Sequence, residues 1–290
     1  MSAVMAIATI ARLTVAEAAR RRILWVLLGL TIVSVALTTL GVERLVSLAR
    51  ADGDTSELEI QVGVSQILIL VAFMFSFVLA MTAAVLAAPA IAADLESGVA
   101  HAMLARPIRR ADYVIGRWIG LAAIVLGYAA LSGALEIAAI GLVSGYTPPE
   151  PLVAVGFLSL QAVTLATLAL LCSTRLPSIA AGAICVVVFG LGWMAGVFAG
   201  IGRFFDAGPL VAAAEASRWL LPTDGLWRGV IFGLEPPAVI LIAAGAAGRV
   251  ADSNPFFAAA PPPATFIVWS LLWIGIVLTL TVVSLRRRDL

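Results

Sequence analysis

Long apolar runs alternate with short polar segments along this chain of 290 residues. A helix needs ~20 apolar residues to cross a bilayer, and six runs have about this length or more. They cover residues 23–41, 64–92, 113–143, 152–172, 179–201 and 265–285. A spanning segment must satisfy its own backbone hydrogen bonds, and alternating ten-residue strands are absent from the sequence. The pattern therefore predicts an all-α membrane protein with six transmembrane helices and a single domain, residues 1–290.

The segment before the first run is weakly amphipathic. Five apolar residues recur there at helical spacing, namely Val4, Ile7, Ala11, Val15 and Ala18. This spacing predicts a short helix that lies at the membrane interface. Ile10 and Leu13 fall toward its polar face, so the amphipathicity is modest. The alternative is a charged leader that only fixes the orientation of the chain.

The longest segment between runs, residues 202–264, contains two shorter apolar stretches. Pro209–Leu221 and Pro237–Gly248 are each too short to span, so we expect re-entrant or amphipathic helices at the outer leaflet. Trp219 and Trp227 suit an interfacial aromatic belt. Residues 43–59 carry five acidic side chains and two arginines, which predicts a solvated outer loop.

The basic residues indicate the orientation of the chain. All eighteen are arginine, and three clusters at 20–22, 106–117 and 286–288 fall on one side if there are six spans. Twelve arginines are then inside and six outside, as expected because cytoplasmic flanks are enriched in Lys and Arg. Both termini are therefore predicted to be cytoplasmic.

Composition excludes several classes of function. Charged residues make up 12% of the chain and hydrophobic residues 62%, whereas a soluble domain is about 25% charged. A phosphate-binding P-loop needs a lysine, and this chain has none, so it should not hydrolyse ATP by itself. Cys172, Cys185 and the single histidine do not form a metal-binding pattern. We find no catalytic constellation and no nucleic-acid motif.

One acid lies deep inside an apolar run. Glu136 belongs to the third span, and an ionisable residue in a membrane is by default a candidate functional group. Its position near the outer end of the span also allows it to reach interfacial water. Both interpretations remain open.

The longest polar interruption in the first half of the chain covers residues 94–117. Leu95, Val99 and Met103 are spaced i, i+4, i+8, which predicts a short surface helix from Asp94 to about Ala105. Pro107 disfavours helix at the residue before it, and Asp112 is placed to act as N-cap of the third span.

This stretch resembles a known family. The run DLESG at residues 94–98, then LARPIRR at 104–110 and Gly116-Arg117 are similar to the inner loop of ABC-2 type permeases, the membrane subunits of one class of ABC exporters. Val99 stands where the family commonly has threonine, and Arg117 where it has lysine. The six-span layout extends the resemblance to the whole chain.

The resemblance implies a permease that contains no nucleotide site. A cytoplasmic ATPase subunit would bind ATP and Mg²⁺ and dock on a coupling helix between the second and third spans. A second permease copy or homologue and membrane lipids would be further partners, in a bacterial plasma membrane. The implied docking residues are Asp94, Leu95, Glu96, Ser97, Gly98, Val99, Met103, Arg106, Pro107, Arg109, Arg110 and Arg117.

Other interpretations remain. The arginines of this stretch would also bind lipid phosphates and enforce topology. The chain as a whole could be an ion-driven secondary carrier or channel, although Glu136 is the one charge found deep in a span. It could also be a membrane scaffold that transports nothing. The sequence does not indicate the substrate.

Overall fold

The computed structural model describes residues 2–20, 22–99, 108–245 and 253–288, whose regular secondary structure is entirely α-helical. Among them, six helices are long and apolar enough to cross a membrane, as predicted. They are α2 (Arg22–Asp52), α3 (Glu57–Ala87) continued by α4 (Pro89–Glu96), α6 (Arg110–Ser144), α7 (Pro151–Ser173), α8 (Ser178–Phe204) and α13 (Ala264–Arg286). Four further helices are shorter, namely α1 (Ala3–Arg20), α9 (Gly208–Leu220), α10 (Thr223–Leu234) and α11 (Pro237–Gly245).

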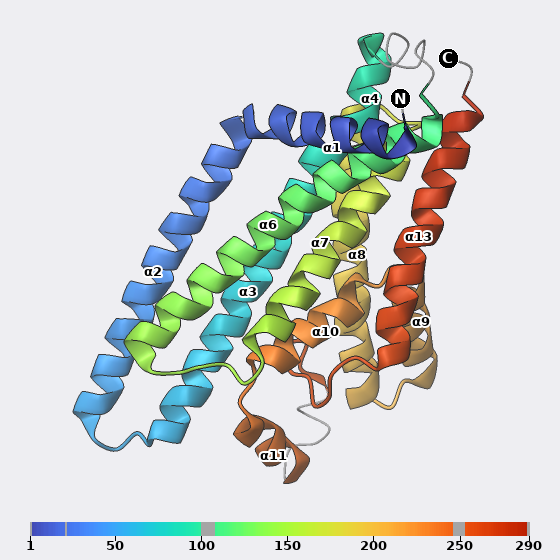
Figure 1. Ribbon diagram of the computed structural model, residues 1–290. Helices are drawn as coiled ribbons and strands as arrows, with labels where there is room; N and C mark the ends of the chain where they lie inside the picture. Colours follow the sequence, from blue (N-terminus) through green and yellow to red (C-terminus); the bar gives the residue numbers. More distant parts are fainter. Residues whose placement is uncertain (1, 21, 100–107, 246–252, 289–290) are drawn as a thin grey trace.

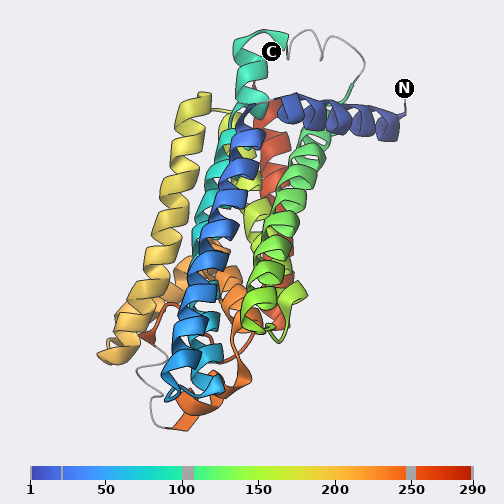
Figure 2. The same cartoon turned by 90° about the vertical axis from the view of Figure 1, so that its left-hand side faces the viewer.

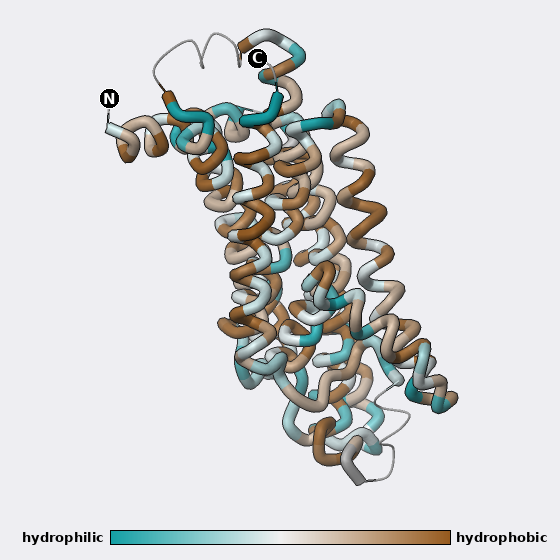
Figure 3. Tube along the Cα trace, turned by 90° about the vertical axis from the view of Figure 1, so that its right-hand side faces the viewer, coloured by the Kyte–Doolittle hydropathy of each residue, from teal (hydrophilic) through white to brown (hydrophobic). Residues whose placement is uncertain are grey.

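The long helices form one elongated bundle (Figure 1). Both chain termini lie at one end, where α1 crosses the bundle and α4 projects from it, as Figure 2 also shows. We call this the terminal end, and the opposite end, which carries α11, the α11 end. Hydrophilic positions concentrate toward the two ends, with hydrophobic positions along the length between them (Figure 3). This distribution is the one that a bilayer imposes on spanning helices.

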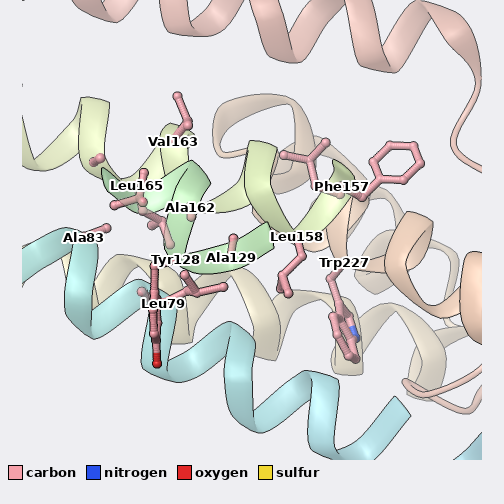
Figure 4. Close-up of a cluster of buried hydrophobic side chains, with 14 of the residues drawn as sticks. Leu79, Ala83, Tyr128, Ala129, Phe157, Leu158, Ala162, Val163, Leu165 and Trp227 are labelled. Carbon is pink, nitrogen blue, oxygen red and sulfur yellow. The ribbon is translucent and has the colours of Figure 1, made fainter. Parts of the chain in front are cut away.

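Helix α7 lies at the centre of the bundle and α2 at its edge. In the most apolar part of each span, 67% of the residues of α7 are buried inside the protein, compared with only 17% of those of α2. Small side chains let the central helices approach one another, since Ala83 of α3, Ala129 of α6 and Ala162 of α7 are all buried (Figure 4). Close packing of this kind is the main source of helix association where lipid surrounds the protein.

The predicted outer loop at residues 43–59 is mostly helical. Helix α2 continues to Asp52 and α3 begins at Glu57, so the connection is only residues 53–56. Gly53 has a φ of +74°, which suits glycine at the end of a helix. Ser56 and Glu59 then form a reciprocal capping box at the start of α3. The polar residues extend both helices beyond the apolar run instead of forming a loop.

Helix α10 enters the bundle, a feature that the sequence did not predict. It joins α11 at a 109° bend, as a re-entrant segment or a broken span would. Three glycines one turn apart allow the close approach, because a Cβ atom would meet the Phe266 ring at Gly225 (2.3 Å) and the Phe157 ring at Gly229 (2.4 Å). At the third, Gly233, a Cβ atom would lie 2.9 Å from the backbone nitrogen of Ala154 on α7.

The assignment of Trp227 to an interfacial belt is wrong. Its side chain is 2% exposed, and its ring centroid lies 5.5 Å from that of Phe73 on α3. Figure 4 shows it among buried side chains of the core. Trp227 is on α10, and burial of that helix places the indole inside the protein.

Candidate functional site at the junction of α1, α4 and α6

A buried arginine joins three helices at the terminal end. The side chain of Arg117, on α6, is only 4% exposed. Its guanidinium forms ion pairs with Asp94 of α4 and with Glu17 of α1. It also donates to the hydroxyl of Thr14 on α1, at 3.3 Å. One cation therefore connects the crossing helix, the end of the second span and the start of the third.

Tyr113 completes the junction one helical turn before Arg117. Its hydroxyl donates to the same carboxylate oxygen of Asp94 that Arg117 contacts. The guanidinium carbon of Arg117 lies 5.7 Å from the centroid of the Tyr113 ring, within the range of a cation–π contact. Residues four apart on a helix share one face, so Tyr113 and Arg117 both hold Asp94 from α6.

The two carboxylates differ in their surroundings. The Asp94 side chain is 17% exposed and that of Glu17 is 54% exposed. Water screens an exposed ion pair and leaves it worth ~0–1 kcal/mol, whereas removing one partner of a buried pair costs ~3–5 kcal/mol. The bond between Asp94 and Arg117 is therefore the strong connection of the junction, and Glu17 adds a weaker tie to α1.

Helix α1 packs closely against α6 at two glycines of α6. A Cβ atom at Gly116 would lie 2.7 Å from Cβ of Ile10, and one at Gly120 would lie 2.6 Å from Cβ of Thr14. The buried face of α1 consists of Ala6, Ile10, Thr14 and Ala18. Ile10, expected on the polar face, is thus buried, because the helix packs against protein along this stripe. Val4, from the predicted apolar face, is 76% exposed, which leaves it free to contact lipid.

The predicted surface helix from Asp94 to Ala105 is interrupted. Helix α4 ends at Glu96, and Ser97 is its C-cap residue. The hydroxyl of Ser97 donates a hydrogen bond to the carbonyl of Ala93 at 2.7 Å. The next residue, Gly98, has a φ of +75°. This left-handed conformation favours glycine and ends helices. Val99 after the turn is helical again. Leu95 packs against the core while Val99 is 44% exposed, so the two do not share one apolar stripe.

The structure divides the predicted docking residues into groups. Glu96, Ser97, Gly98 and Val99 are exposed at the terminal end, and so is Arg109. Asp94 and Arg117 are inside the junction, where Arg117 cannot present its charge to a partner. Met103, Arg106 and Pro107 lie outside the described residues. We define the four consecutive exposed residues, 96–99, as the 96–99 turn.

Arg110 bonds to the end of the last span. Its guanidinium donates to the backbone carbonyls of Leu285, Arg286 and Arg288, at 2.9 to 3.0 Å. Carbonyl groups at the end of a helix lack the usual donor four residues further on, and an arginine satisfies them. The carbonyl of Leu285 also accepts from the backbone N–H of Arg288 at 3.3 Å. The expected N-cap Asp112 is instead in the first turn of α6, and Arg109 occupies the N-cap position. An acid in the first turn still interacts favourably with the helix dipole.

Sequence analysis identified Asp94 and Arg117 but missed Tyr113, Thr14 and Glu17. The i, i+4 spacing of Tyr113 and Arg117 was visible, and so was the i, i+3 spacing of Thr14 and Glu17. What the sequence lacks is any sign that α1 folds back over α6. Glu136, the other predicted residue, is 19 positions beyond Arg117 on α6, about 28 Å along the helix axis, and does not belong to the junction.

The family model described as ABC-2 family transporter protein matches residues 8–290. The chain belongs to the ABC-2 transporter family. Its members are membrane subunits of ABC transporters without an ATP-binding domain of their own, which agrees with the lysine-free sequence. A search of curated proteins finds no match. The junction of α1, α4 and α6 is therefore part of the multi-pass membrane domain of an ABC-2 permease.

Proposed function

We propose that this chain is the permease subunit of an ABC exporter and that a separate ATPase subunit docks at its 96–99 turn. The supporting observation is the position of that turn: it is exposed at the end of the helix that continues the second span, and Asp94, two residues before it, is bonded to Arg117. A displacement of the turn would therefore be transmitted through this ion pair to α6, and through Arg117 to α1.

The helices that leave the junction are long. Residues 57–96 form a 40-residue stretch and α6 has 35 residues, so the two are about 60 and 52 Å in length at ~1.5 Å per residue. Stiff helices of this length transmit movement by rigid-body rocking. The partner would bind ATP and Mg²⁺. This chain would provide the helices that transmit the movement and the path across the membrane.

The orientation and the remaining partners belong to the same proposal. The terminal end faces the cytoplasm of a bacterial plasma membrane, because α1 ends at Arg20, α2 begins at Arg22 and α13 ends at Arg286 there. Helix α1 lies in the inner interface, with its exposed apolar residues in lipid. A second copy of this chain or a homologue completes the translocation path.

Isolation of the tagged chain from native membranes tests this function. We expect a soluble subunit with a P-loop lysine to be recovered with it, and ATP hydrolysis to require that subunit. Glu96→Arg should abolish recovery of the subunit, because it reverses the charge at the 96–99 turn. Glu43→Arg is the matched control, since Glu43 is equally exposed but lies on α2 toward the α11 end. Hydrolysis by the purified chain alone, or equal recovery with both variants, would contradict the proposal.

A further inference from the structure

A carboxyl group without a hydrogen-bond partner in the described part of the chain is buried inside the bundle, next to a small apolar cavity. Glu136 is 3% exposed, and neither of its carboxyl oxygens has a hydrogen-bond partner among the described residues. The cavity has a volume of about 30 Å³ and lies between α3, α6, α7 and α10. Its lining is entirely apolar, with Leu68, Leu158, Val230 and Leu234 among the wall residues, and Glu136 contributes only carbon atoms to it.

An unpaired carboxylate in such surroundings has to be neutralised. Moving an isolated charge from water into an apolar medium costs far more than any single contact returns. Acids inside membrane domains accordingly pair with a cation or carry a proton, and chains of them form proton relays. Both carboxyl oxygens of Glu136 are covered by neighbouring protein atoms, so no cation larger than a proton fits beside them. A proton is therefore the ligand that fits without rearrangement.

A second buried acid lies between this cavity and the α11 end. Glu235 follows Leu234, whose side chain lines the Glu136 cavity, and precedes Pro236, which lines a surface pocket of about 170 Å³. Glu235 is 1% exposed. One of its oxygens accepts from the backbone N–H of Ala258 at 3.3 Å, and the other has no partner among the described residues.

A surface pocket adjoins the residues that follow Glu235. Tyr146, Thr147 and Pro237 line it, and the last two are exposed to solvent. The hydroxyl of Tyr146 donates to the carbonyl of Leu234 at 2.6 Å. Burial raises the pKa of this tyrosine, and the nearby Glu235 carboxylate raises it further. The cavity wall at Leu234, the buried Glu235 and the pocket wall at Pro236 are thus consecutive along the chain.

The neighbouring helices bring no described cation to Glu136. Thr38 of α2 lies beside it, but its hydroxyl donates to the carbonyl of Ser34. Gln66 of α3 lies beside Glu235. The charged residues near the start of α10, Asp224 and Arg228, are 3.9 Å apart, and Asp224 also pairs with Arg218. The remaining charges on α2, on α3 and before α7 are exposed, namely Arg22, Glu43, Arg44, Arg50, Asp52, Glu57, Glu59 and Glu150.

We propose that Glu136 is a proton-binding site of the permease, reached from the α11 end through Glu235. The chain takes up a proton there and releases it on the same side when water reaches the carboxyl group. Transport would then depend on the pH of the medium at the α11 end. The proposal concerns this chain alone, and its test requires no ATPase subunit.

Infrared spectroscopy of the purified chain in lipid tests the site. We expect a carbonyl band of a protonated carboxylic acid that is absent in Glu136→Gln. The band should shift after transfer to D₂O, and several-fold more slowly in Glu235→Gln, which keeps an acceptor for the N–H of Ala258. Glu150→Gln is the control, because Glu150 is exposed, and it should change neither property. A band that persists in Glu136→Gln, or that never shifts in D₂O, overturns the proposal.

A measurement on the unmodified chain covers the case in which Glu136→Gln does not fold. A hydrophobic carbodiimide reacts with protonated carboxyl groups that it reaches from the membrane, and peptide mass spectrometry then locates the adduct. We expect the adduct on Glu136, with less of it as the pH is raised. No adduct on Glu136 across the pH range would overturn the assignment.

Discussion

Replacing Arg117 by methionine removes the cation that joins α1, α4 and α6. Methionine is also unbranched, so it fills much of the space of the aliphatic part of arginine. Asp94 is then left mostly buried, at 17% exposure, with the Tyr113 hydroxyl as its donor. Breaking a buried ion pair costs ~3–5 kcal/mol, and because Asp94 keeps Tyr113 we expect the lower value, about 3 kcal/mol. Glu17→Gln should cost less than about 1 kcal/mol, because Glu17 is 54% exposed and screened by water.

The assay is equilibrium unfolding of the purified protein with increasing mole fraction of SDS, followed by far-UV circular dichroism. A double-mutant cycle of Arg117→Met with Asp94→Asn isolates the pair, and residues in direct contact give coupling energies of ~0.5–3 kcal/mol. We expect about 2 kcal/mol for this cycle and nearly zero for Arg117→Met with Glu17→Gln. Equal costs for Arg117→Met and Glu17→Gln, or no coupling between Asp94 and Arg117, would refute the assignment of Asp94 and Arg117 as the strong connection.

Two further predictions concern the same end of the protein. Gly120→Leu should displace α1, because its Cβ would lie 2.6 Å from Thr14, and trypsin should then cleave faster at Arg12. Gly127→Leu is the control, since a Cβ there meets nothing within 4 Å, and equal cleavage rates would contradict the packing. Arg110→Gln should cost about 1.5 kcal/mol locally and speed amide exchange at residues 283–288 by roughly tenfold. The control is Arg109→Gln at an exposed neighbouring position, which should leave that exchange rate unchanged. An exchange rate in Arg110→Gln equal to that of the unmodified chain would show that the hydrogen bonds from Arg110 do not stabilise the end of α13.

Hydrophobicity alone predicted the six spans, because a bilayer requires long apolar helices and the chain carries its charges between them. It failed at α10. That helix contains Asp224 and Arg228, which lower its hydropathy, and the sequence does not show that Arg218 pairs with Asp224 inside the protein. Its glycines at 225, 229 and 233, one turn apart, are the sequence signal of this close packing.

At the site, the residues were easier to identify than their arrangement. Asp94 and Arg117 were both candidates, but 22 residues lie between them, and sequence spacing does not reveal that they form an ion pair. The apolar spacing of Leu95 and Val99 suggested one continuous helix. The glycine at 98 was the contrary signal, since a positive φ at that position ends α4. Local patterns indicate helices, whereas contacts between distant segments depend on the packed bundle.

The most direct test of the account is recovery of the ATPase subunit with the Gly98→Pro variant. Proline fixes φ near −65°, so it cannot adopt the +75° of Gly98 and must distort the 96–99 turn without changing its charge. We predict that the variant inserts and folds but neither retains the ATPase subunit nor supports its stimulated hydrolysis. Normal recovery and normal hydrolysis in a correctly inserted Gly98→Pro protein would show that the partner docks elsewhere.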